Sequence, residues 1–363
     1  MGAQARSLED AAPRDRRAAT ARALMLGAAA ALVVAAVLSL SIGPTGITLA
    51  ALPEAVSHWL GASDEAEAAR HSLVLLEIRL PRTLLGMFVG AALAVAGAMM
   101  QGLFRNPLAD PGLVGVSSGA ALAAVATIAL GNEIAPAFIS AFGPYALPVA
   151  AFLGGIATTW ILVVVAGRHG RLMIGTLLLA GVAIAAFAGA MTGLIAFVSD
   201  DRELRDLTLW TLGSLAGASW PKVIAVMPFA ILILIAIPRL MRGLNGFLLG
   251  EAEAFHLGIN VEATKRFVVV TTAACVGAAV AVAGVIGFIG IVVPHFVRLI
   301  AGPDHRIVLP ASALAGGALM VTADIIARML VRPAELPIGV VMAAIGAPIF
   351  LHLVLKRGIG GVE

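Results

Sequence analysis

One short string in this sequence has the pattern of a catalytic nucleophile. Gly115-Val-Ser-Ser-Gly119 matches G-x-S-x-G, in which a sharp strand-to-helix turn exposes the serine. In so apolar a chain, one interpretation is an intramembrane serine protease with Ser117 as nucleophile and His295 or His352 as base. The other is that small residues simply begin a packed helix. We favour packing, because the strand–turn–helix context is missing and nothing marks an oxyanion hole.

A second chemical candidate is Asp324, the one acidic residue well inside an apolar stretch. An intramembrane carboxylate is a functional candidate by default, and a proton relay in an ion-driven carrier would need one. Arg328, however, follows four residues later on the same helical face. We therefore favour a local Asp324–Arg328 ion pair over a proton relay.

Other catalytic motifs are absent from the sequence. No G-x-x-x-x-G-K-[ST] string cradles nucleotide phosphates, so any ATP hydrolysis must take place in another subunit. There is no H-E-x-x-H string, and the single cysteine, Cys275, excludes an intrachain disulfide and a Cys-based zinc cluster. We expect no catalytic residue, no bound metal and no permanently bound cofactor.

The composition indicates that these residues are positioned by membrane helices. Of the 363 residues, 60% are hydrophobic and 12% charged, whereas a soluble domain has about 45–50% apolar and about 25% charged residues. Apolar runs long enough to span a bilayer occur ten times, with a soft boundary between the seventh and eighth near residues 284–290. The runs cover 22–42, 83–102, 113–130, 146–166, 172–197, 222–238, 266–283, 285–300, 309–327 and 338–355. We expect an all-α polytopic membrane protein with about ten transmembrane helices.

The distribution of lysine and arginine sets the expected orientation. With ten spans and both termini in the cytoplasm, 16 of the 24 basic residues lie inside and 8 outside. This predicts a cytoplasmic tail over 1–21, one transmembrane domain over 22–355 and a second tail over 356–363. The basic residues before the first run also fit a signal peptide. A retained helix is preferred, because the run is long and no small-x-small cleavage site follows it. Since the basic residues flank the spans, the net charge of +3 does not indicate nucleic-acid binding.

Two segments have a composition that allows two interpretations each. The inner segment 239–265 predicts one or two short helices punctuated by Gly250 and Gly258, either as a docking surface or as an ordinary amphipathic connector. The fifth span, over 175–193, is rich in alanine and glycine. It could line a wide apolar pathway or pack tightly on a neighbour.

Several strings, spread from about residue 79 to 350, resemble the permease subunits of bacterial ABC importers for iron-siderophores, haem and cobalamin. They are Arg79-Leu-Pro-Arg82, the run from Val89 through Asn106-Pro-Leu-Ala-Asp-Pro-Gly112 to Ala120, Leu177–Gly181, Trp210–Leu215, Leu249–Asn260, Gly287–Arg298 and Glu335–Gly339.

The resemblance implies a homodimer in the bacterial inner membrane, with two cytoplasmic ATP-binding subunits that use ATP and a periplasmic substrate-binding protein. It also implies roles by position. Docking of the binding protein falls to Arg79, Arg82 and Arg328, and the cytoplasmic gate to Asn106, Leu108, Gly175 and Thr176. Coupling to the ATPases falls to Gly250, Glu251, Ala254, Leu257 and Gly258, and pathway lining to Ala185, Ala188, Gly189 and Thr192. The resemblance also implies that the 248–260 insert corresponds to the coupling helices that fit into clefts on the ATPases, which favours docking for the 239–265 segment. The protease and the ion-driven carrier become remote alternatives.

The predicted transported substrate is haem. The stretch 199–215 resembles the haem-importing branch more than the other branches, and a pathway of alanine, glycine and methionine suits a flat apolar macrocycle. An iron-siderophore or cobalamin is the alternative cargo for the same machine.

Overall fold

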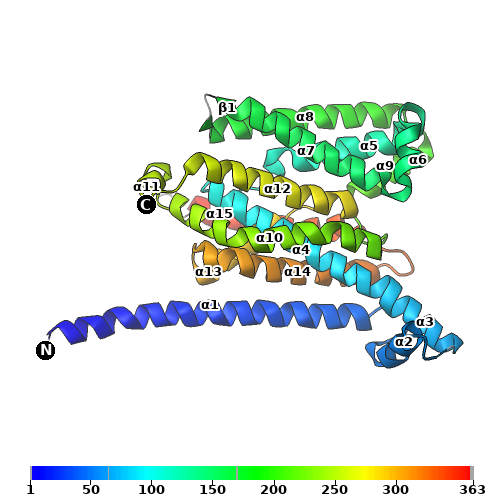
Figure 1. The fold of residues 1–363 in the computed structure, drawn as a ribbon, viewed down its shortest axis with the longest axis horizontal. Coiled ribbons are helices and arrows are strands. Elements are labelled where there is room, and N and C mark those ends of the chain that lie inside the picture. Colours follow the sequence, from blue (N-terminus) through cyan, green and yellow to red (C-terminus); the bar gives the residue numbers. More distant parts are fainter. Residues whose placement is uncertain (1, 64, 169–170, 360–363) are drawn as a thin grey trace.

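The computed structural model describes residues 2–63, 65–168 and 171–359, and it is a bundle of helices (Figure 1). Each of the ten apolar runs corresponds to one helix. The helices are α1 (Gly2–Ser41), α4 (Leu80–Leu103), α5 (Val116–Ile134), α7 (Ala146–Ala166), α8 (Ile174–Val198), α10 (Trp220–Phe247), α12 (Val261–Ala283), α13 (Ile289–Ala301), α14 (His305–Met329) and α15 (Ile338–Ile359). Among the described residues, seven helical stretches are long and apolar enough to cross a membrane. The protein is thus an all-α polytopic membrane protein, as predicted.

Shorter elements connect these helices. They are η1 (Leu49–Ala51), α2 (Leu52–Trp59), α3 (Ala66–Ser72), η2 (Leu73–Arg79), η3 (Pro111–Val114), α6 (Pro136–Phe142), η4 (Gly143–Tyr145), α9 (Asp201–Thr211) and α11 (Glu251–His256). A minimal antiparallel hairpin, β1 (Gly167–Arg168) with β2 (Arg171–Leu172), joins α7 to α8 and pairs Gly167 with Leu172.

The two ends of the bundle carry different elements. Helix α11, the β-hairpin and both chain termini lie at one end, on the left of Figure 1, which we call the α11 end. Helices α2, α3, α6 and α9 lie at the other, which we call the α3 end. An even number of membrane crossings places both termini at the same end of the bundle.

Helix α4 is at the centre of the bundle. It contacts α10, α12, α13 and α14, and 19 of its 24 residues are buried. A side chain at Gly97 would overlap the carbonyl of Gly290 on α13, so a glycine is needed where these helices approach each other. Without a strong hydrophobic driving force in lipid, such close packing of small residues stabilises the bundle.

The largest differences from the sequence expectation are at three boundaries, and α15 also extends to Ile359, into the expected tail 356–363. Helix α1 extends back to Gly2, so the described part of the expected tail 1–21 continues the helix. Helix α10 extends to Phe247 and α12 begins at Val261, so the connector is 248–260 rather than 239–265. In each case the apolar pattern ends before the helix does, because backbone hydrogen bonding continues the helix into polar sequence. The soft boundary near 284–290 is a defined break, with positive φ at Gly284 and Phe288.

Candidate functional site

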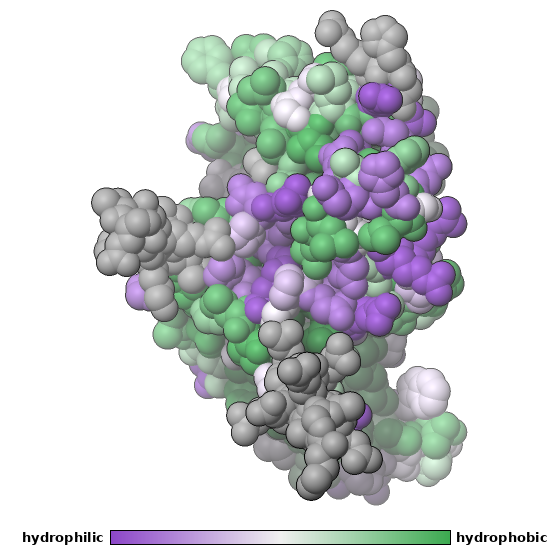
Figure 2. Space-filling model, turned by 90° about the vertical axis from the view of Figure 1, so that its left-hand side faces the viewer, coloured by the Kyte–Doolittle hydropathy of each residue, from purple (hydrophilic) through white to green (hydrophobic). Residues whose placement is uncertain are grey.

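The α11 end presents a polar face around a short helix. Viewed from this end, hydrophilic side chains gather across the centre of the molecule (Figure 2). Helix α11 lies between two residues with positive φ, Gly250 and Gly258, as the glycine punctuation predicts. Ala254 is buried beneath the helix, whereas Phe255 and Leu257 are 69% and 64% exposed. Two large apolar side chains are therefore exposed within this polar face.

A cleft of about 1140 Å³ runs between α11 and the start of α8. Its lining includes Glu251 and Gly258, from the predicted coupling set, and Gly175, from the predicted gate. The fold therefore brings one predicted gate residue to the same cleft as two predicted coupling residues. Thr176, the neighbouring gate candidate, is half-buried in the first turn of α8.

The other predicted gate residues lie in the loop between α4 and α5. Asn106 is exposed, and its Oδ1 accepts a hydrogen bond from the backbone N–H of Leu108 at 3.0 Å, a side-chain turn that fixes the loop locally. The loop residues Arg105 and Pro107 line a separate pocket of about 300 Å³ with Gln101, Arg298 and His305. The structure thus divides the four gate candidates between the α4–α5 loop and the first turn of α8.

Asp110 ends the same loop. Its Oδ1 accepts the backbone N–H of Gly112 at 2.7 Å and caps η3. Burial raises the pKa of Asp110, and the hydrogen bond from Gly112 opposes that rise.

Helix α8, which carries the predicted pathway residues, lies at the edge of the described chain. Only 17% of its apolar window is buried. Gly189 is exposed with open space beside it, Ala185 and Thr192 are half-buried, and Ala188 is packed against the chain at 3% exposure. Within one chain, Gly189 therefore faces outward while Ala188 belongs to the packed side of the helix.

The three predicted docking arginines, Arg79, Arg82 and Arg328, meet near the α3 end but point into the molecule. They are 3%, 8% and 5% exposed. The guanidinium group of Arg79 donates to the carbonyls of Leu40 at 2.5 Å and Ile47 at 2.7 Å. It therefore fastens the end of α1 and the segment after it to the end of η2, directly before α4 begins.

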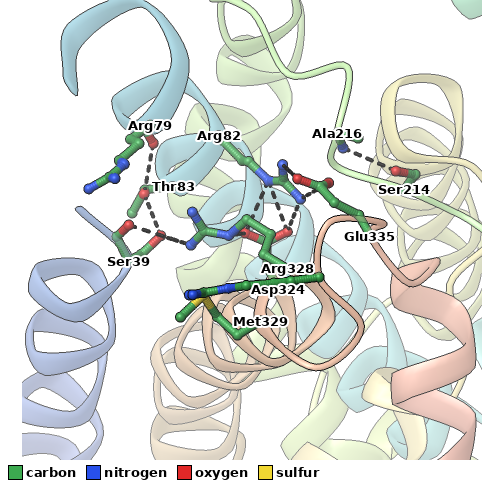
Figure 3. Close-up of polar contacts among 11 residues, drawn as sticks. Ser39, Arg79, Arg82, Thr83, Ser214, Ala216, Asp324, Arg328, Met329 and Glu335 are labelled. Atoms are coloured by element: carbon green, nitrogen blue, oxygen red, sulfur yellow. Dashed lines mark hydrogen bonds and ion pairs between the residues drawn. The ribbon is translucent and has the colours of Figure 1, made fainter. Parts of the chain in front are cut away.

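Arg82 and Arg328 share the carboxylate of Asp324 (Figure 3). Arg82 Nη2 lies 2.9 Å from Asp324 Oδ1, and Arg328 Nε lies 3.1 Å from Asp324 Oδ2. Arg82 also donates to both oxygens of Glu335, at 3.1 and 2.9 Å. The predicted Asp324–Arg328 pair is confirmed, and it is one part of a larger network.

Two members of this network have partners that the sequence pattern does not indicate. Glu335 lies in the α14–α15 loop, and Ser39 lies on α1. Arg328 Nη2 donates to Ser39 Oγ at 3.0 Å, and Ser39 Oγ is 2.8 Å from Thr83 Oγ1. Both are visible only in three dimensions, because their partners are far away in the chain. The network joins α1, α4, α14 and the α14–α15 loop.

Lys265 is the residue that sequence reasoning overlooked at the α11 end. It is 4% exposed and bonds to α11, α12 and β2. The available signal was Glu262 three residues before it, an acidic–basic pair at helical spacing at the start of a membrane helix.

The G-x-S-x-G string lies in a helical context. The element before it is the 3-10 turn η3, and Ser117 is the second residue of α5. A side chain at Gly119 would overlap Thr158 and the carbonyl of Gly154 on α7. The small residues of the motif therefore allow α5 and α7 to pack closely, which the packing interpretation predicts.

Comparison with known proteins gives a consistent result. Residues 31–356 match the family model described as the FecCD transport family. The Hemin transport system permease protein HmuU of Yersinia pestis is 46% identical over 288 residues, which cover 78% of this chain and 84% of that protein. The Vitamin B12 import system permease protein BtuC of Klebsiella pneumoniae is 42% identical over 297 residues, covering 81% and 86%.

Two further matches span nearly the whole chain. The Cobalamin import system permease protein BtuC of Halobacterium salinarum is 38% identical over 375 residues, covering 94% of this chain and 98% of that protein. A solved structure described as an inward-facing conformation of a metal-chelate type ABC transporter superposes with a TM-score of 0.78 at 30% identity. That match covers 92% of this chain and 99% of the other.

Proposed function

The chain belongs to the FecCD transport family, and we propose that it is the permease of an ATP-driven importer that carries haem across the bacterial inner membrane. It is a multi-pass inner-membrane protein and a transport permease of the class that handles haem, cobalamin or siderophores. The finer assignment to haem rests on the 46% identity to a hemin permease, against 42% and 38% for the two cobalamin permeases.

We propose that the transporter contains two copies of this chain, two ATP-binding subunits and a substrate-binding protein. The loosely packed α8, with Gly189 open to its surroundings, suits a pathway wall completed by the second copy. The α11 end, with Phe255 and Leu257 exposed on a polar face, suits contact with a cytoplasmic ATPase. The α11 end is accordingly the cytoplasmic end, and the α3 end faces the periplasm.

The binding protein docks at the α3 end in this proposal. Arg79, Arg82 and Arg328 all bond within the chain. Direct pairing with a carboxylate of the binding protein therefore requires one of them to exchange an internal partner. We propose that these three arginines stabilise the docking surface from beneath. The exposed Arg332, in the loop that follows α14, presents positive charge at the surface itself.

Transport then proceeds by alternating access. Loaded binding protein and bound ATP must favour different conformations, because a ligand shifts an equilibrium only by its differential affinity for the two states. Movement of the ATPases reaches the gate segments through α11. The cargo passes without covalent chemistry, and ATP is hydrolysed by the partner subunits.

The test is uptake by the whole complex. The permease, its ATPase and its binding protein are reconstituted in vesicles, and ATP-dependent accumulation is measured for haem, cyanocobalamin and a ferric siderophore. Haem accumulation that needs both ATP and the binding protein supports the proposal. Accumulation of cobalamin or siderophore without haem contradicts the substrate assignment, and uptake that is independent of ATP contradicts the transporter class.

A further inference from the structure

Lys265 bonds to three separate elements at the α11 end through a single ammonium group. Its Nζ lies 2.6 Å from Glu251 Oε2 on α11, 3.4 Å from Glu262 Oε1 on α12 and 3.3 Å from the carbonyl oxygen of Leu172 on β2. A lysine ammonium has three N–H donors. All three are therefore used, and each goes to a different part of the chain.

A second contact closes this arrangement into a ring. The other oxygen of Glu262, Oε2, accepts the backbone N–H of Leu172 at 2.6 Å. Both backbone polar groups of Leu172 are thus held by α12 side chains. Leu172 itself is 2% exposed, so β2 is fixed by packing as well as by hydrogen bonds.

The burial of this group makes the link costly to break. The Lys265 side chain is 5% exposed, compared with 45% for Glu251 and 30% for Glu262. A buried cation is tolerated only when it is paired, and here the ion pairs are its compensation. Removing the ammonium would leave two carboxylates facing each other and would free the Leu172 carbonyl.

Because β2 lies directly before α8, the contacts of Lys265 with β2 reach the predicted gate residues. A single residue, Met173, separates Leu172 from α8, which begins at Ile174, and the gate candidates Gly175 and Thr176 lie in the first turn of α8. Met173, which lies between Leu172 and α8, donates its backbone N–H to the carbonyl oxygen of Ala166 at 3.1 Å. A few hydrogen-bonded groups therefore connect α11 to the start of α8.

We propose that Lys265 is a positioning residue for transport: it couples movement of α11 to the first turn of α8, so that ATP hydrolysis opens and closes the gate. This inference rests on the proposed function, in which α11 contacts the ATPase. Glu251 on α11 and Glu262 on α12 act through their ion pairs with Lys265.

The test measures ATP hydrolysis and uptake in the same vesicles. In Lys265→Met the complex still hydrolyses ATP, but the amount of substrate moved per ATP falls at least about tenfold. A change of this size is ordinary for allosteric coupling between two sites. Glu251→Gln gives a smaller loss in the same direction, and adding it to Lys265→Met causes little further loss, because both changes break one link. Lys265→Arg retains part of the coupling. Lys222→Met, the same chemical change near the α3 end, leaves the ratio of substrate moved to ATP hydrolysed unchanged.

A merely structural role gives a different result. If uptake and hydrolysis fall together with a constant ratio, or if the ratio in Lys265→Met and Glu251→Gln equals that of the unmodified protein, the inference is overturned. Should Lys265→Met fail to assemble, Lys265→Arg and Glu251→Gln decide the outcome by the same ratio.

A second readout does not depend on the substrate. A cysteine is placed at Met173, which is 51% exposed, while the native Cys275 is fully buried. Maleimide labelling of this cysteine in the complex should change on addition of ATP, and the change should be lost in Lys265→Met. If no substrate is transported by the unmodified complex, the proposed function fails, while this labelling comparison still decides the role of Lys265. An identical ATP-induced change in both proteins contradicts the inference.

Discussion

The guanidinium group of Arg82 lies 2.9 Å from the carboxylate of Asp324, Nη2 to Oδ1, although 242 residues separate the two in the chain. Arg82 is near the beginning of α4 and Asp324 is in the last third of α14. Both oxygens of Asp324 are occupied by guanidinium groups, and the side chain is 3% exposed. This carboxylate therefore stabilises the contact between two helices, and the arrangement does not favour an ion-driven carrier.

Removing this carboxylate should destabilise the fold. Asp324→Ala leaves two buried arginines without their shared counter-charge, and breaking a buried pair in this way costs about 3–5 kcal/mol. We expect a clearly lower melting temperature for the purified protein in detergent. Asp206→Ala, an exposed carboxylate on α9, is the matched control and should leave the melting temperature unchanged. Equal melting temperatures for Asp324→Ala and the unmodified protein would contradict the structural role.

Substitution of a surface arginine and of a buried arginine should affect docking of the binding protein in different ways. Arg332→Gln should weaken docking at low salt more than at high salt, with no change in melting temperature, because a rim charge acts mainly through long-range attraction. Arg82→Gln should lower the melting temperature, because it breaks bonds to Asp324 and Glu335. Docking affinity measured at two salt concentrations, alongside melting temperature, checks both. If Arg82→Gln shows the salt-dependent loss with full stability, the buried arginines are the direct contacts.

In the G-x-S-x-G string, the second glycine should matter more than the serine. Gly119→Val places a branched side chain where α5 meets Thr158 and the Gly154 carbonyl, and overpacking of this kind costs about 1–3 kcal/mol. Ser117→Ala should leave both stability and ATP-dependent uptake unchanged. Loss of function in Ser117→Ala with normal stability would revive the protease interpretation.

The exposed side chains beside α11 should contribute to binding of the ATPase. Leu257 is 64% exposed, and Leu257→Asp puts a charge where an apolar contact is proposed. We expect less ATPase subunit to co-purify with the variant permease. Leu330→Asp is a control of similar exposure, 68%, near the α3 end, and should co-purify the ATPase normally. Equal recovery in the two variants would show that Leu257 lies outside the interface.

The α4–α5 loop should contribute a pH dependence. Because the pKa of Asp110 is raised by burial, the folded chain binds more protons than the unfolded chain between the ordinary and the raised value. The free energy of unfolding contributed by this group is therefore greatest at acid pH and falls as pH rises through that window. Asp110→Asn removes the titration but keeps an oxygen for the Gly112 N–H.

Melting temperatures measured over a pH series check this sign. The unmodified protein and Asp110→Asn should agree at acid pH, and the variant should become the more stable of the two as pH rises. If the unmodified protein instead gains stability over the variant with rising pH, the carboxylate is stabilised by its surroundings and the argument fails.

The membrane-spanning elements could be predicted from local sequence alone. Apolar runs of sufficient length each became one helix, glycine residues 250 and 258 marked the ends of α11, and Asp324 paired with Arg328 one turn away. These features depend on local hydropathy, backbone freedom and helical spacing, which a single sequence displays directly.

The contacts between distant parts of the chain, in contrast, depend on the packing of the whole bundle. The pairing of Arg82 with Asp324, the inward direction of the predicted docking arginines and the contacts of Lys265 with α11 and β2 join segments from 14 to 242 residues apart. A charge pattern shows that a buried arginine or lysine needs partners, because burying an unpaired charge is costly. Which partners it finds depends on how the helices pack, and that packing depends on contacts across the whole bundle.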